Sequence, residues 1–376
     1  MRKVLIVLVC LAVSFGMAQD YVFGINFDAG GKFDGSFNEG TWRGLVRAVD
    51  ELEAQGLEID LLEFEGTPET SAQGLRGMAG QGAELIVAPG FLQADALFTV
   101  AAEFPDTAFV SIDGEPPGGQ SPRANTLYAK FREQEGSFLV GYIAGTMTQT
   151  GVVGFVGGMD IPLIRAFDLG YQEGVNMACP ECEVISNYIG VTEAAWNDPA
   201  RARELASTQR AQGADIIYAA AGGSGRGVID FVNTTMCYEP TGEQRESPLS
   251  EILQDIPKSE QYESRCSGNA EPLFFIGVDW NQNPEGDTDG DPTTLNHGLT
   301  SMLKRVDVAA YNAAFDIVDG TFEGGVLNLG LAEDGVGYAL DEYNEALIPQ
   351  SLLDELAEIS EQIIAGEIEV TDYRQQ

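Results

Sequence analysis

The order of apolar and polar residues alternates between strand-like and helix-like stretches from residue 21 onward. Short β-branched runs such as 21–27 and 108–112 predict buried strands, and stretches with apolar residues at helical spacing, such as 40–55, predict helices. This strict alternation is typical of an α/β fold with a doubly wound parallel sheet. Further strands are expected at 59–64, 85–88, 152–156, 183–188 and 216–219, and further helices at 68–81, 95–103, 133–148, 163–177, 199–212 and 227–231.

Several predicted strands end in glycines or in an acidic residue. Residues 151–162 join a β-branched run to paired glycines, an acid and a helix-starting proline, 215–225 join a strand to a glycine-rich turn, and Asp279 ends the run 275–279. Ligands of open α/β sheets lie at the carboxyl ends of strands, where glycines admit backbone and helix N-termini present free N–H groups. These strand ends carry almost no catalytic chemistry, so they predict a binding cleft rather than an active site.

The first residues have the features of an export signal. Two basic residues precede the apolar run 4–13, and small residues end it, which predicts a signal peptide over 1–18. The run is shorter than the ~20 residues that span a bilayer. Cys10 lies too early for lipid attachment and does not follow a small residue. We therefore expect a periplasmic or otherwise exported protein that is soluble after cleavage.

A chain of 376 residues exceeds the size at which one core keeps growing, so two domains are expected. The formal net charge is −39, with 20 Lys and Arg against 59 Asp and Glu. So few basic residues argue against nucleic acid or anionic lipid as a partner. The acidity indicates either adaptation to high salt, which we favour, or a well-solvated surface.

If the acidity is an adaptation to salt, added salt should stabilise the fold because it screens repulsion between carboxylates. The melting temperature is predicted to rise by several degrees between about 0.1 M and about 2 M KCl. Differential scanning calorimetry measures this directly. A melting temperature that stays constant or falls would favour a merely well-solvated surface.

Four cysteines remain after the signal, an even number that predicts two disulfides in an exported protein. A Cys237–Cys266 bond would close a polar stretch, and a Cys179–Cys182 bond would close a small loop, although the sequence leaves the connectivity open. A zinc site is less favoured because no histidine lies near and the compartment is oxidising. A redox C-x-x-C is a further alternative that the surroundings do not favour.

Two segments break the alternation. Residues 236–272 are rich in Glu, Ser, Pro and Gln and predict a surface insertion with one short helix. Asp287, Asp289 and Asp291 stand at alternate positions, as in a calcium loop. Pro292 stands where such a loop needs its turn glycine, so a solvated acidic loop is favoured over a calcium site.

Six short segments of this chain match the motifs of a known protein family and occur in the same order as in that family. Together they resemble the basic membrane protein family of ABC-transporter substrate-binding proteins, which includes the purine nucleoside receptors. The similarity covers nearly the whole mature chain, and the departures are the missing lipid-anchor cysteine, the insertion, the acidic loop and the acidity. The segments are 34–38, 131–136, 154–162, 219–225, 277–279 and 301–307.

The resemblance implies a type I periplasmic binding protein fold, with two doubly wound parallel-sheet lobes joined by a three-stranded hinge. It also implies a monomer that binds a nucleoside in the cleft between the lobes, delivers it to an ABC permease and needs no cofactor or metal. The expected lobes are 19–129 plus 280–324 and 130–279 plus 325–376, with crossings near Lys130, Asp279 and Gly324.

By family position, Phe37 and Trp196 would stack on the two faces of the base, although the family usually has Phe at the second position. The alternative is that either ring packs locally under a loop. Asp28 ends the first strand and would accept from a base N–H, and Asn38 would serve base or sugar.

The remaining candidates come mainly from strand ends. Asp113 and Asp279 would accept hydrogen bonds from ribose hydroxyls. Lys304 opens a predicted helix and is expected in the cleft rather than at the surface. Gly222 and Gly223 would bring backbone N–H groups to the ligand, and Met159 would line the second lobe.

An enzyme is the alternative class. His297, the only histidine, has no Ser or Cys elbow beside it, which disfavours nucleophilic catalysis. Abundant carboxylates leave a nucleoside or glycoside hydrolase as an alternative, although Asp28 stands alone where a nucleoside hydrolase has its calcium-binding aspartates. A binding protein for another small molecule, such as a sugar, is the other alternative.

Overall fold

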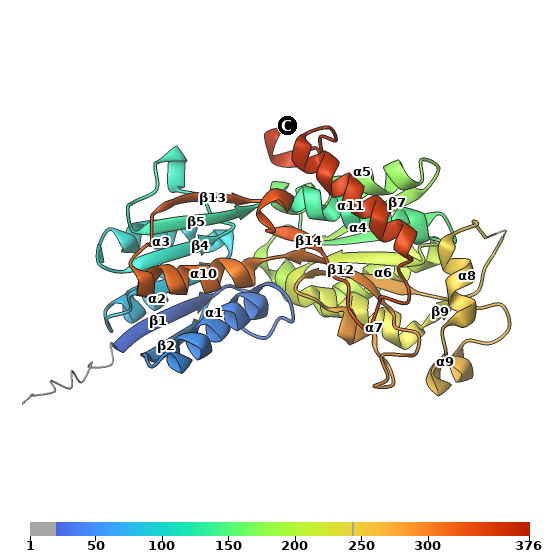
Figure 1. Ribbon diagram of the computed structural model, residues 1–376, viewed down its shortest axis with the longest axis horizontal. Coiled ribbons are helices and arrows are strands. Elements are labelled where there is room, and N and C mark those ends of the chain that lie inside the picture. Colours follow the sequence, from blue (N-terminus) through green and yellow to red (C-terminus); the bar gives the residue numbers. More distant parts are fainter. Residues whose placement is uncertain (1–19, 243) are drawn as a thin grey trace, which may run out of the picture.

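The computed structural model describes residues 20–242 and 244–376, which form two α/β lobes side by side along the long axis of the molecule (Figure 1). The predicted signal peptide lies outside the described residues. Each lobe is built on a six-stranded sheet with helices on both faces. The structure thus confirms the two doubly wound lobes that the family resemblance implies.

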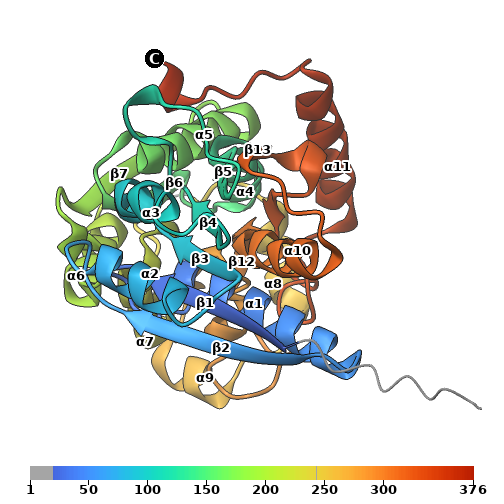
Figure 2. The same cartoon turned by 90° about the vertical axis from the view of Figure 1, so that its left-hand side faces the viewer.

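The first lobe has an all-parallel sheet in the order β13-β5-β4-β3-β1-β2. Its central strands are buried along their whole length, as their continuous apolar sequences predict. Helices α1 and α10 pack together on one face, and α2 and α3 on the other (Figure 2). The strands are β1 (Asp20–Phe27), β2 (Glu58–Glu65), β3 (Leu85–Pro89), β4 (Ala108–Ile112), β5 (Thr126–Phe131) and β13 (Gly325–Leu329), and the helices are α1 (Phe37–Ala54), α2 (Ser71–Ala79), α3 (Ala94–Ala101) and α10 (Val306–Asp319).

The second lobe has a sheet in the order β14-β12-β11-β8-β6-β7, parallel except for the β12–β14 pair. Helices α4 and α5 pack together on one face, α6 and α7 on the other, and α11 lies against α4. The strands are β6 (Val152–Met159), β7 (Glu183–Gly190), β8 (Ile216–Ala220), β11 (Phe274–Asp279), β12 (Gly298–Lys304) and β14 (Val336–Tyr338), and the helices are α4 (Glu133–Met147), α5 (Pro162–Ala178), α6 (Pro199–Ala211), α7 (Arg226–Thr235) and α11 (Gln350–Ala365).

The chain crosses between the lobes at 131–133, 304–306 and 329–336, so the predicted boundaries need correction. The crossing expected near Asp279 is wrong, because β12 returns beside β11 in the second sheet. The crossing expected near Gly324 is too early, because β13 still pairs with β5. Lys304 is therefore the last residue of β12 and does not open α10.

The insertion is more ordered than its polar sequence predicts. Its described residues form two short helices instead of one, and Leu249 and Leu253 of the first and Tyr262 of the second are buried. The Cys237–Cys266 disulfide, with its Cα atoms 6.0 Å apart, closes the unit. Its elements are β9 (Cys237–Tyr238), α8 (Pro248–Asp255), α9 (Glu260–Arg265) and β10 (Glu271–Pro272).

A Cys179–Cys182 disulfide is also present, with a Cα–Cα distance of 5.3 Å, so the prediction of two disulfides is confirmed and the structure gives their connectivity. In the acidic loop, Oδ1 of Asp287 accepts from the N–H groups of Asp289 and Gly290. Within 20–242 and 244–376, no group of three or more His, Cys, Asp or Glu is placed to hold a metal ion. None of the described helices has both the length and the apolar character of a membrane span.

Candidate functional site

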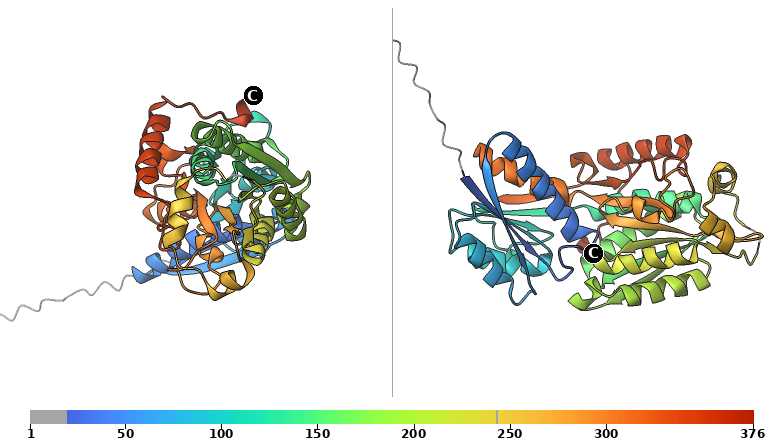
Figure 3. Two further views of the ribbon diagram at one scale, coloured as in Figure 1. Left: turned by 90° about the vertical axis from the view of Figure 1, so that its right-hand side faces the viewer. Right: turned by 90° about the horizontal axis from the view of Figure 1, so that it is seen from below.

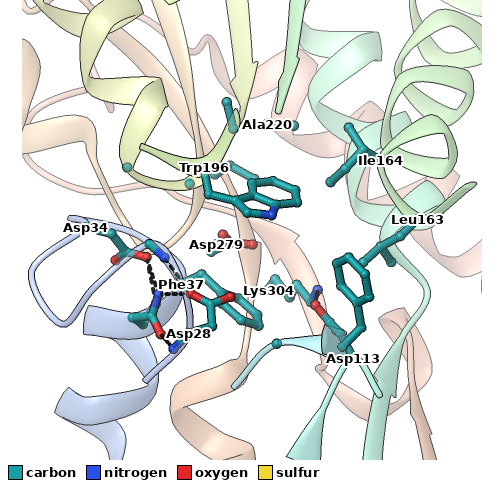
Figure 4. A pocket seen from close by; sticks show the side chains of 18 of the residues that line it. Asp28, Asp34, Phe37, Asp113, Leu163, Ile164, Trp196, Ala220, Asp279 and Lys304 are labelled. Carbon is teal, nitrogen blue, oxygen red and sulfur yellow. Dashed lines mark hydrogen bonds and ion pairs between the residues drawn. The ribbon is translucent and has the colours of Figure 1, made fainter. Parts of the chain in front are cut away.

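A cavity lies between the lobes, where the carboxyl ends of strands from both sheets meet (Figure 4). It contains about 560 Å³ of empty space, including the part that opens to solvent. All the predicted site residues except Met159 line it. They are Asp28, Phe37, Asn38, Asp113, Trp196, Gly222, Gly223, Asp279 and Lys304.

Two aromatic side chains from different lobes face each other across this cavity. Phe37 is the first residue of α1, and Trp196 ends the short 3-10 helix Glu193–Trp196 that follows β7. Figure 4 shows the two rings on opposite sides of the space, with Asp279 between them in the view. A Cβ at Gly158 would lie 2.4 Å from the Trp196 ring, so only glycine lets the indole rest on β6. The rings therefore form the two sides of a slot for a flat group.

Met159 is the one predicted site residue that does not line the cavity. It is the last residue of β6 and is half-buried, but it is not among the residues of the cavity wall. The expectation that Met159 lines the cleft in the second lobe is therefore not supported.

Asp28 presents one free carboxylate oxygen beside the slot. Its Oδ1 accepts from Nδ2 of Asn38 at 2.7 Å and from the N–H of Gly30 at 2.9 Å. No hydrogen bond among the described residues engages Oδ2. Asn38 has its amide fully engaged, because Nδ2 also donates to Asp34 and Oδ1 accepts from the N–H of Asp28. Asn38 therefore positions two carboxylates rather than offering a free donor.

Asp34 was not predicted as a site residue, yet it lines the cavity and holds the start of α1. Its carboxylate accepts from the N–H groups of Ser36, Asn38 and Glu39 at 2.9–3.1 Å. These are N–H groups that have no partner inside a helix. By fixing the first turn of α1, Asp34 also fixes the Phe37 ring at the cavity.

Lys304 lies at the centre of a buried charge cluster. Its Nζ is 2.6 Å from Oδ2 of Asp113 and 3.1 Å from Oε1 of Glu133, and the three side chains are 2 %, 6 % and 0 % exposed. Burial alone would lower the pKa of Lys304, but Asp113, Glu133 and Asp279 together raise it above its ordinary value. Oδ1 of Asp113 is buried and has no donor among the described residues.

Asp279 joins the two lobes directly. Its Oδ2 accepts from Oγ of Ser36, which also donates to the carbonyl of Val278. A second bond across the cleft runs from Nε2 of Gln282 to the carbonyl of Gly35 at 2.9 Å. The start of α1 in the first lobe is thus held against the end of β11 in the second, which describes a closed arrangement of the lobes.

Apolar residues that the sequence did not single out complete the cavity wall. Phe91 follows β3, and Leu163, Ile164 and Phe167 lie in the first turns of α5. The segment 151–162, which the sequence marked, ends where α5 begins, so the motif pointed to this region but not to these side chains. These residues exclude water from the slot and strengthen polar contacts inside it.

Burial raises the pKa of Asp279 to about 7, although Lys304 and the Ser36 hydrogen bond oppose the shift. Burial likewise raises the pKa of Asp28 to about 6, against the lowering by Asn38 and Gly30. In the folded protein these two carboxyl groups keep their protons above pH 3.8, where the same groups in an unfolded chain release them. The stability that this contributes is complete below pH 3.8, falls as the pH rises, and is lost once the pH has passed about 6 for Asp28 and about 7 for Asp279.

We predict that replacing Asp279 by asparagine removes part of the stability loss between about pH 4 and about pH 7. Each unit of pKa difference between folded and unfolded states corresponds to about 1.4 kcal/mol. Thermal melts of ligand-free protein across this range measure the effect, with the exposed Asp106→Asn as the control. A pH profile of Asp279→Asn parallel to that of the control would show that Asp279 does not titrate in this range.

The residues around the cavity favour binding over catalysis. His297 is 1 % exposed, and its Nδ1 lies 2.7 Å from the carbonyl of Leu273, away from the cavity lining. Four aspartates and a single lysine make the polar lining strongly acidic. Such a lining suits a ligand that is rich in hydrogen-bond donors and carries no negative charge.

Comparisons with known proteins agree on one class. The family described as "ABC transporter substrate-binding protein PnrA-like" matches residues 24–238. Basic membrane protein D of Borreliella burgdorferi is 29% identical over 87% of this chain and 84% of its own. An uncharacterised lipoprotein of Pyrococcus abyssi is 31% identical over 84% of this chain and 68% of its own.

A solved structure extends the comparison to the fold. The crystal structure of an ABC transporter solute-binding protein from Aeropyrum pernix K1 matches with a TM-score of 0.70 and 26% identity, over 94% of this chain and 93% of the other. The prediction of a type I periplasmic binding protein fold is therefore confirmed.

Proposed function

Because the chain belongs to the PnrA-like family of ABC transporter substrate-binding proteins, we propose that it binds a purine nucleoside between its lobes and delivers it, as a monomer, to an ABC permease. Solute-binding proteins of this family act outside the cytoplasm and are not enzymes. The prediction of a binding protein rather than a hydrolase is confirmed. The choice of ligand rests on the cavity.

The observation that carries the proposal is the slot between Phe37 and Trp196. A purine is flat and apolar on both faces, so it can stack on both rings at once. A pyranose ring is puckered and would contact two such faces less completely. At the edge of the slot, the free Oδ2 of Asp28 would accept a hydrogen bond from a base N–H.

Carboxylates beside the slot suit a pentose. Oδ1 of Asp113 lacks a donor among the described residues, and a ribose hydroxyl would supply one. Only one carboxylate oxygen of Asp279 is engaged by Ser36. Hydrogen bonds to charged acceptors contribute about 1.5–3 kcal/mol each when buried. The same carboxylates would repel a phosphate, so the proposed ligand is a nucleoside and not a nucleotide.

The proposed mechanism is ligand-stabilised closure of the hinge. Phe37 and Asp113 come from the first lobe, and Trp196, Asp279 and Lys304 from the second. A ligand that touches both sets binds the closed state more tightly and shifts the equilibrium toward it. The closed surface would then be the one that the permease recognises.

Isothermal titration calorimetry of the refolded, ligand-free protein tests the proposal. Inosine, adenosine and guanosine should bind, hypoxanthine and ribose should bind more weakly, and inosine 5′-monophosphate should not bind. Chromatography of the same samples should show no free base, which separates binding from hydrolysis. Tight binding of ribose without any preference for nucleosides would instead indicate a sugar-binding protein.

A further inference from the structure

The C-terminal segment returns to the junction of the two lobes. After α11 the chain runs along α5, where the N–H of Thr371 donates to Oε2 of Glu173 at 2.9 Å and the 3-10 turn Tyr373–Gln375 packs on the helix. The C-terminus lies at the level of the lobe junction in two perpendicular views (Figures 1 and 3). A segment that belongs to the second lobe by sequence thus reaches the hinge.

Arg374 is the residue of this segment that contacts the hinge. Its Nη1 lies 2.8 Å from Oε2 of Glu133, and its Nη2 donates to the carbonyl of Phe131 at 3.1 Å. Nη2 also donates to Oε1 of Gln134, and Nε pairs with Asp372 at 2.8 Å. The three hinge partners belong to the crossing between β5 and α4.

Glu133 connects Arg374 to the cavity. It is fully buried and lies between two cations, with Arg374 on one carboxylate oxygen and Lys304 at 3.1 Å on the other. Lys304 in turn holds Asp113. Without Arg374, the single charge of Lys304 would have to balance two buried carboxylates, and the pull of Glu133 would compete with that of Asp113. A buried charge that loses its partner is costly, so the geometry of the cluster would change.

We propose that Arg374 is a positioning residue of the binding site: it neutralises Glu133 at the hinge and so leaves Lys304 directed at Asp113 in the cleft. Its effect on nucleoside affinity rests on the proposed function, whereas its effect on Asp113 does not. Arg374 itself does not line the cavity. It belongs to the carboxy-terminal segment of the second lobe and acts through Glu133 and Lys304 on the charge of Asp113, a residue of the first lobe.

A matched pair of variants separates charge from packing. Arg374→Gln keeps a donor for the Phe131 carbonyl but removes the charge, and Arg374→Lys keeps the charge. We expect Arg374→Gln to weaken inosine binding by about tenfold, within the range of coupled buried neighbours, and Arg374→Lys to recover part of the loss. In a Glu133→Gln background, the same Arg374→Gln change should alter affinity by less than about threefold, because no charge remains to balance. Arg201→Gln, in the exposed pair with Glu204, is the control.

A second measurement does not need a ligand. The 13Cγ signal of Asp113, assigned with Asp113→Asn, reports its titration in the presence of its charged neighbours Lys304, Glu133, Asp279 and Asp28. Arg374→Gln should move the titration midpoint upward, and Arg374→Lys should leave it near that of the wild type. If the wild-type protein binds no nucleoside, the proposed function is refuted, but the titration of Asp113 still decides the role of Arg374. An Asp113 midpoint that is the same in all three proteins would overturn the inference.

Discussion

Replacing Lys304 by methionine is expected to lower the free energy of unfolding by about 3–5 kcal/mol, the range for breaking a buried ion pair on one side. The change keeps the length and the apolar part of the side chain. It leaves Asp113 without its partner and leaves Glu133 dependent on Arg374 alone. Urea denaturation of the ligand-free protein measures the difference.

The control for this variant is Lys130→Met. Lys130 pairs with Glu115, and their side chains are 27 % and 66 % exposed, so water can replace the lost partner. Exposed ion pairs contribute about 0–1 kcal/mol. Equal destabilisation by the two variants would mean that Lys304 has no special role in the buried cluster.

Replacing Trp196 by alanine is expected to weaken nucleoside binding by about 1–3 kcal/mol, the usual loss when an aromatic side chain that stacks on a base is removed. The ring forms one side of the slot, and an alanine side chain would leave that side without a stacking face. Trp196→Phe should retain most of the affinity because it keeps a stacking face. Calorimetric titration with inosine measures both variants.

Trp42 provides the matched control for this experiment. Trp42 belongs to α1, is half-buried and does not line the cavity, and Nζ of Lys32 lies 4.1 Å from the centroid of its ring. Trp42→Ala should leave inosine affinity unchanged. A Trp196→Ala variant that binds inosine as tightly as Trp42→Ala would remove the basis for a stacked base.

The strand ends were the part of the site that could be predicted from sequence. Asp28, Asp113 and Asp279 each follow a short apolar run, and the carboxyl ends of parallel strands meet at one edge of the sheet. Asp113 and Asp279 even adopt positive φ angles of 66° and 63°, which turn the chain at the cavity. Local pattern and topology agree at these positions, so the prediction needed no knowledge of packing.

The rest depends on tertiary contacts that no local pattern encodes. Asp34 stands in a loop and gains its role from the helix turn that it caps. Glu133 looks like an ordinary acid in the first turn of a helix, and only the crossing between the lobes buries it beside Lys304. Arg374 lies 241 positions away from Glu133 in the sequence, where spacing carries no information. The crossing at 304–306 was missed because strand β12 follows β11 without an intervening α-helix.

The most direct test of the central claim is a crystal structure of the protein with bound inosine. We predict that the base lies between the rings of Phe37 and Trp196, with its edge at Asp28 and the ribose hydroxyls within hydrogen-bonding distance of Asp113 or Asp279. Inosine bound outside the cleft, or with its sugar between the two rings and its base in solvent, would contradict the account.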